Sequence, residues 1–130
     1  MKDLKPTCRI AVVQAAPVLF DKTACTDKAV RLIAECAQHG AELIVFPELF
    51  IPGYPYGMTF GFTVGARKED GRKDWQLYCG NSIVVPGPET ERLAAAAKAA
   101  AYMLLTGREA PTVDLLTPKG IALTLPISSA

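Results

Sequence analysis

Apolar runs and helical periodicity alternate in the first part of the chain. Residues 9–14 form a nearly continuous apolar run, which is typical of a central strand covered on both faces. Over residues 23–39 apolar side chains recur every three or four positions, and Gly40 follows where a left-handed residue often ends a helix. Residues 42–46 are again a β-type run. The order strand, helix, strand predicts a βαβ crossover, in which the two strands need not be adjacent but a parallel arrangement is favoured.

The next part of the chain predicts a second long helix. Residues 89–103 are rich in alanine, and Glu89 and Glu91 at the start favour the positive end of a helix dipole. Before this helix, residues 74–78 predict a short helix and residues 82–88 an extended connector.

The remaining segments give weaker patterns. Residues 61–73 are polar, contain glycine and predict irregular structure. Residues 102–106 and 112–116 have the composition of strands, and residues 118–120 predict a turn before the last apolar run.

Glu48 directly follows the second predicted strand. Pro47 ends that strand, and the prolines and glycines of residues 52–57 require a shaped loop. Open α/β sheets place their ligand sites beyond the carboxyl ends of their strands. If the Glu48 side chain points into a cleft among its apolar neighbours, partial desolvation favours proton uptake, as a general base requires. A surface or loop-capping carboxylate is the alternative on these grounds.

Several segments resemble one known family in both residue identity and spacing. IAVVQAAP at residues 10–17 and GAELIVFPE at residues 40–48 resemble the opening of nitrilase-superfamily proteins. FIPGYP at residues 50–55 and VPGPE at residues 85–89 are similar to the nitrilase branch proper, rather than to the amidases or carbamoylases. Trp75, Tyr78 and Ser82 fit that branch too, and the resemblance covers about residues 8–107.

The resemblance implies an αββα sandwich whose active site joins a glutamate, a lysine and a cysteine, with no metal and no organic cofactor. In such an enzyme the cysteine thiolate attacks a nitrile carbon, the glutamate takes up and returns protons, and the lysine stabilises the developing charge. Glu48 matches the glutamate, the proton acceptor. Tyr54 is expected either to line the substrate pocket or to fix the loop by packing.

The resemblance ends near Gly107, so we expect one incomplete hydrolase domain over residues 1–130 with a divergent tail at residues 108–130. The lysine-bearing and cysteine-bearing segments of the family have no match, and Lys119 does not occupy the lysine's position relative to Gly120. The isolated chain is therefore expected to be inactive.

The four cysteines and the single histidine have simpler interpretations. None of the cysteines has the nucleophile's context, although Cys79 is the least implausible reactive thiol. Without CxxC spacing or a secretory signal, reduced and mostly buried thiols are expected rather than disulfides. His39 ends the first predicted helix, where capping is expected.

Composition excludes several classes of function. The chain has 130 residues, enough for one domain, and its 14 Lys and Arg against 13 Asp and Glu give a net charge of +1, so no nucleic-acid face is expected. Its longest apolar stretch, residues 93–105, is too short for a bilayer and contains Lys98. No signal-like segment follows Met1, which predicts a cytoplasmic protein. No glycine-rich phosphate-binding loop follows the first strand, which argues against a nucleotide-binding module.

We therefore predict an α/β fold, the amino-terminal part of a nitrilase-like sandwich, with both long helices in one layer and with strand edges and apolar surface left uncovered. The leading functional hypothesis is hydrolysis of a small-molecule nitrile. The alternative is a non-catalytic interaction protein that associates with full-length relatives; a homo-oligomer is also possible.

Overall fold

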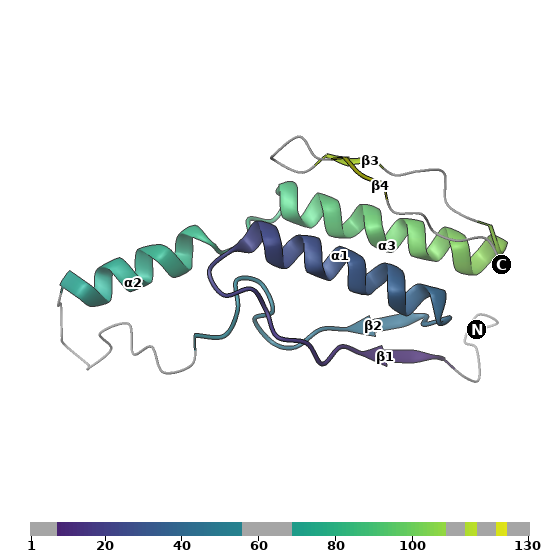
Figure 1. Ribbon diagram of the computed structural model, residues 1–130, viewed down its shortest axis with the longest axis horizontal. Helices are drawn as coiled ribbons and strands as arrows, with labels where there is room; N and C mark the ends of the chain where they lie inside the picture. The colour runs from purple at the N-terminus through teal and green to yellow at the C-terminus, as the bar shows by residue number, and fades with distance from the viewer. Residues whose placement is uncertain (1–7, 56–68, 109–113, 117–121, 125–130) are drawn as a thin grey trace, which may run out of the picture.

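The computed structural model describes residues 8–55, 69–108, 114–116 and 122–124. They form a mixed α/β structure, as predicted, in which two long helices lie side by side over a pair of short strands (Figure 1). The elements in chain order are β1 (Ile10–Val12), α1 (Lys22–Gln38), β2 (Leu43–Val45), α2 (Glu69–Gly80), α3 (Pro88–Thr106), β3 (Asp114–Leu116) and β4 (Ala122–Thr124).

Strands β1 and β2 are adjacent and parallel, with Ile10 opposite Leu43 and Val12 opposite Val45. The pairing continues past the strand end, where the Val13 N–H donates to the Val45 carbonyl at 2.8 Å. Helix α1 connects the two strands, so the predicted βαβ crossover is confirmed. Both strands direct their carboxyl ends toward the end of the fold where α1 begins (Figure 1).

Side chains cap α1 at both ends. Asp21 accepts a hydrogen bond from the Ala24 N–H at 2.8 Å, which satisfies one free donor of the first turn. At the other end Gly40 adopts φ +78°, the left-handed conformation predicted there. The His39 ring Nδ1 lies 2.8 Å from the Glu35 carbonyl, which can only accept, so the ring donates. The capping role predicted for His39 is confirmed.

Helix α3 is longer than its alanine-rich segment. It begins at Pro88, where the Thr90 hydroxyl accepts from the Gly87 N–H at 2.9 Å. It continues through Thr106 and ends at Gly107, whose N–H donates to the Met103 carbonyl at 2.9 Å. The predicted strand at residues 102–106 is therefore wrong. Those residues extend an existing helix. Each added residue gains a hydrogen bond without the cost of starting a new helix, until a glycine ends it.

The main core lies between α1 and α3, which form one layer, as expected. The two helices run in the same direction (Figure 1). Val30, Ile33 and Ala37 of α1 pack against Ala96 and Ala100 of α3, and all five side chains are buried. The small alanine side chains allow close approach of the two helices, and burial of the larger α1 side chains contributes apolar stabilisation.

The sheet face that points away from the helices is open. Ile10, Val12, Leu43 and Val45 are between 44% and 75% exposed. The prediction of a strand covered on both faces is therefore wrong for the part of the chain that the structure describes. The uncovered edges and apolar surface expected for this chain are observed instead.

Helix α2 begins at Glu69, five positions before the helix predicted from Asp74, so the end of the segment assigned to irregular structure is helical. An ion pair between Glu69 and Lys73, 3.3 Å apart at i and i+4, favours this first turn. Helix α2 projects beyond the α1 and α3 pair (Figure 1).

Strand β3 confirms part of the strand predicted at residues 112–116, and it pairs antiparallel with β4. The predicted turn at residues 118–120 and the predicted irregular structure at residues 61–68 lie outside the described residues. Of the helices in the described ranges, none is long and apolar enough to cross a membrane.

Candidate functional site

The segment after β2, residues 47–53, is a compact loop that we call the Glu48 loop. Its first turn is closed by a hydrogen bond from the Phe50 N–H to the Pro47 carbonyl at 3.3 Å, and the Gly53 N–H donates to the Leu49 carbonyl at 2.9 Å. Leu49 has φ +52°, a left-handed conformation that is disfavoured for a residue with a side chain. Glu48 lies between Pro47 and Leu49, so this turn sets its backbone position.

Cys25, in the first turns of α1, joins the Glu48 loop to the segment that follows β1. Its side chain is fully buried. Its Sγ accepts a hydrogen bond from the Val18 N–H at 3.0 Å and lies 3.1 Å from the carbonyl oxygen of Phe50, to which the thiol can donate. Burial raises the pKa of the Cys25 thiol, an effect that the Val18 hydrogen bond only partly offsets.

Further contacts join the same two segments. The Phe20 N–H donates to the Pro52 carbonyl at 3.1 Å. Gly53 has φ +103°, and a Cβ there would lie 2.9 Å from the Leu19 Cδ1 and 3.3 Å from the Pro17 Cγ. Only glycine fits both this backbone conformation and this close approach. The loops that leave β1 and β2 are thus packed together at the carboxyl end of the strands.

The structure places Glu48 at this end of the sheet, as the sequence predicts, but its side chain is exposed. No hydrogen bond or ion pair joins its carboxylate to another described residue. The burial on which the expectation of favoured proton uptake depended is therefore absent in the described residues. Tyr54 is also exposed, at 46%. The catalytic role of Glu48 and the pocket role of Tyr54 remain predictions.

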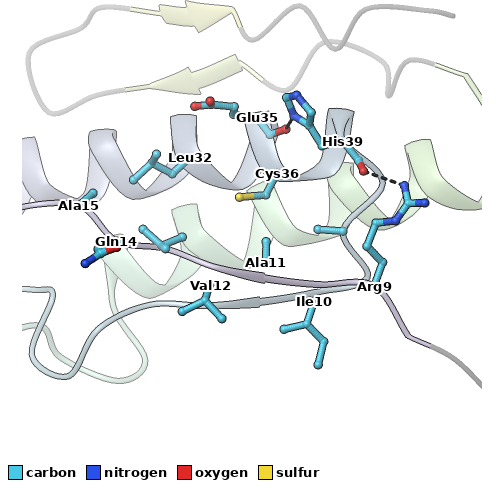
Figure 2. A pocket seen from close by; sticks show the side chains of 12 residues that line it. Arg9, Ile10, Ala11, Val12, Gln14, Ala15, Leu32, Glu35, Cys36 and His39 are labelled. Atoms are coloured by element: carbon cyan, nitrogen blue, oxygen red, sulfur yellow. Dashed lines mark hydrogen bonds between the residues drawn. The ribbon is translucent and has the colours of Figure 1, made fainter.

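Two cavities lie beside the outer edges of the strand pair, and Glu48 lines neither of them. One, of about 320 Å³, lies between the outer edge of β1 and α1 (Figure 2). Figure 2 shows Ile10 and Val12 pointing away from α1 while Ala11 points toward it. The other, of about 220 Å³, lies between β2 and α3. Both strand edges are thus flanked by open space among the described residues.

The cysteines are free, but they are less buried than expected. Cys25 is buried and Cys36 is partly buried, whereas Cys8 and Cys79 are exposed. Cys8 precedes β1 and Cys79 lies in the last turn of α2, and both positions are peripheral to the α1 and α3 core. Burial also raises the pKa of Cys36. Within the described ranges, no group of three or more His, Cys, Asp or Glu side chains could hold a metal ion.

Cys25 is the residue at this site that the sequence did not reveal. Its position in the first predicted helix was visible, but its contact with the Glu48 loop depends on how two loops fold together. Its place in the chain gives one indication. Cys25 lies close to the start of α1, and α1 starts at the carboxyl end of the strands.

Residues 9–112 match the family described as carbon-nitrogen hydrolase. A bifunctional nitrilase/nitrile hydratase of Nicotiana tabacum is 50% identical over 101 residues, which cover 77% of this chain and 29% of that protein. An aliphatic nitrilase of Sinorhizobium fredii (strain HH103) is 46% identical over 121 residues, which cover 88% of this chain and 39% of that protein.

Nitrilase 1 of Arabidopsis thaliana is 46% identical over 101 residues and is covered over 29% of its length. The chain thus spans between about three tenths and two fifths of the length of these relatives. The resemblance to nitrilases seen in the sequence is confirmed. Since the family match covers most of the chain, the protein belongs to the carbon-nitrogen hydrolase family.

Proposed function

We propose that this chain supplies the general-base glutamate, Glu48, of a hydrolase that converts a nitrile to a carboxylic acid and ammonia. The observation that carries the proposal is the place of Glu48 in the fold. It follows the carboxyl end of β2 in a loop whose backbone is hydrogen-bonded to Cys25 and Phe20. Ligand sites of open α/β sheets lie at this end of the strands. The relatives described above carry nitrilase names, which supports the same chemistry.

In the proposed reaction a cysteine thiolate attacks the nitrile carbon, and a lysine ammonium stabilises the negative charge that develops on the nitrogen. Glu48 takes the proton from the thiol and delivers it to the nitrogen, which gives a thioimidate. A first water adds to the thioimidate carbon and its two protons pass to the nitrogen, so that ammonia leaves and a thioester remains. A second water hydrolyses the thioester, which releases the acid and returns a proton to the thiol. Release of an amide is the other outcome of the same chemistry, and the name of the tobacco relative includes both activities.

The lysine and the cysteine of this mechanism have no match in the 130 residues. We therefore propose that the chain on its own does not hydrolyse nitriles. Covalent catalysis without its nucleophile loses the reaction route itself, and catalytic residues that act as a unit are strongly non-additive.

The test is to express the protein from its natural gene, measure its intact mass and assay ammonia release from a panel of aliphatic and aromatic nitriles. A species heavier than 13.9 kDa that releases ammonia supports the proposal. A 13.9 kDa species that releases ammonia contradicts the requirement for the lysine and cysteine segments. A 13.9 kDa species without turnover contradicts the proposal that this chain supplies Glu48 to an active hydrolase.

The second candidate is a non-catalytic protein that associates with full-length nitrilases. The open face of β1 and β2 favours it, since Ile10 and Val12 are 55% and 75% exposed and Leu43 and Val45 extend the same apolar surface. Exposed strand edges and apolar patches of this kind are typical of association surfaces.

Co-expression with a full-length nitrilase tests this candidate. Retention of the chain on the tagged partner, with loss of retention in a Val12→Lys variant, supports association through the open face. A Lys98→Ala variant, at an exposed position of α3, is the matched control and should be retained. A chain that elutes alone as a monomer contradicts it.

A further inference from the structure

We infer that Cys25 is a positioning residue for Glu48, because its thiol joins the first turns of α1 to the Glu48 loop and so sets where the Glu48 carboxylate lies. The inference rests on the function proposed for Glu48. Cys25 is 0% exposed and belongs to no disulfide, so its contribution is made through hydrogen bonds and packing.

The contact geometry gives the thiol two partners in two different segments. The Val18 N–H, in the segment after β1, donates to Sγ at 3.0 Å. The carbonyl oxygens of Phe50 and Val18 lie 3.1 Å and 3.4 Å from Sγ. A thiol has one proton to donate, and the shorter distance favours Phe50 as its acceptor. Cys25 thus accepts from one loop and donates to the other.

The first turn of the Glu48 loop, residues 47–50, is weakly held by its own backbone, so contacts from outside the loop matter for it. The bond from the Phe50 N–H to the Pro47 carbonyl is long, at 3.3 Å, and Leu49 stands in a disfavoured left-handed conformation. Backbone of this kind persists only where surrounding contacts hold it. The Cys25 thiol fixes the Phe50 carbonyl, two positions along the chain from Glu48, so its loss should change where Glu48 lies.

The thiol form is the form that this role requires. Burial raises the pKa of Cys25, so the side chain keeps its proton and remains a donor at neutral pH. Serine has a hydroxyl that can both accept and donate in the same place, whereas alanine can do neither. Cys25→Ser should therefore keep the hydrogen bonds that Cys25→Ala removes.

Amide hydrogen exchange on the 130-residue chain tests the structural half of the inference. The probes are the Gly53 and Phe20 N–H groups, which close the Glu48 loop and join it to the segment before α1. In Cys25→Ala both should exchange about fivefold to tenfold faster relative to the core amides of α1, and Cys25→Ser should stay within about twofold of the wild type.

Val30→Ala is the matched control, since Val30 is also buried in α1 but belongs to the cluster that packs against α3. It should change core amides without accelerating Gly53 and Phe20 selectively. The inference is overturned if Cys25→Ala exchanges like the wild type, if Cys25→Ser exchanges like Cys25→Ala, or if Val30→Ala gives the same selective acceleration. Random-coil exchange of both probes in the wild type also overturns it.

Kinetics of the nitrile-hydrolysing protein that carries this chain test the functional half. Cys25→Ala should lower kcat about tenfold or more with KM little changed, and Cys25→Ser should restore most of kcat. Faster exchange without a change in kcat overturns the positioning role. If Glu48→Gln leaves ammonia release intact, the proposed function fails while the exchange result stands, so the two failures are distinguishable.

Discussion

Arg92 on α3 and Asp27 on α1 form an ion pair at the helix interface, with 10% and 26% of their side-chain surfaces exposed. The Nε of Arg92 is buried and has no hydrogen-bond partner among the described residues. Lys22 and Glu89, 3.7 Å apart, form a second charged contact nearer the starts of the two helices. Both charged pairs join α1 to α3, and the largely buried Arg92 guanidinium has Asp27 as its counter-charge.

Removing one partner of the Asp27 and Arg92 pair should therefore be costly. In Asp27→Asn the buried guanidinium loses its counter-charge, and we expect the free energy of unfolding to fall by about 2 kcal/mol, below the value for a fully buried pair because Asp27 is partly exposed. Urea denaturation followed by circular dichroism measures the change.

The matched control for Asp27→Asn is Glu69→Gln. Glu69 and Lys73 form an ion pair in which both side chains are mostly exposed, so this change should alter stability by less than about 0.5 kcal/mol. Equal effects of the two substitutions would mean that the helix interface does not depend on the buried pair.

Much of the fold could be predicted from the sequence because its signals are local. The periodicity of residues 23–39, with Gly40 after it, predicts α1 to within one residue at each end. The end of α3 could not be predicted in the same way. Tyr102 to Thr106 have strand-like composition, but they extend a helix whose hydrogen bonds are already in place, and cooperativity outweighs intrinsic preference there.

The open face of the strands could not be predicted for a different reason. A continuous apolar run such as residues 9–14 indicates that both faces are suited to burial. It does not show what covers them, which depends on residues far away in the chain or in another molecule.

The candidate site also has one part that the sequence predicts and one part that it does not. The position of Glu48 at a strand end follows from Pro47 and from the apolar run before it. Its exposure and its hydrogen-bonded surroundings depend on tertiary contacts. The bond between Cys25 and Phe50 joins residues far apart in the sequence, and no spacing rule predicts it.

Gly53→Ala should destabilise the loop arrangement. The added Cβ would lie 2.9 Å from Leu19 at a backbone φ of +103°, so both strain and a clash oppose it. We expect a loss of about 1 to 3 kcal/mol in the free energy of unfolding, measured by thermal or urea denaturation.

Gly80→Ala is the comparison for Gly53→Ala, since a Cβ at Gly80 meets nothing within 4 Å. That change should be neutral or slightly stabilising, because alanine favours a helix over glycine. A Gly53→Ala protein as stable as the wild type would show that residues 47–53 are not packed as described.

The buried thiol of Cys25 should make stability fall in alkali. Burial raises its pKa in the folded protein above the ordinary value of 9.0, so on raising the pH the unfolded chain loses this proton first. The stabilisation is fully present below the unfolded pKa and is lost as the pH rises toward the folded pKa. Cys36 acts in the same direction.

Urea midpoints measured from pH 7 to pH 10.5 check this dependence. The wild-type midpoint should decline at the alkaline end, and the decline should be shallower in Cys25→Ser, with Cys36→Ser as the comparison for a thiol that is only partly buried. An unchanged decline in Cys25→Ser would show that other groups cause the loss of stability at alkaline pH.

The most direct test of the proposed role of Glu48 is the kcat for ammonia release by the proposed hydrolase to which this chain would contribute, compared between the wild type and Glu48→Gln. General-base catalysis contributes about a hundredfold to ten-thousandfold, so Glu48→Gln should lose at least about a hundredfold in kcat. Glu35→Gln, at an exposed position of α1, should retain near wild-type kcat. A Glu48→Gln protein that turns over like Glu35→Gln would contradict the role assigned to Glu48.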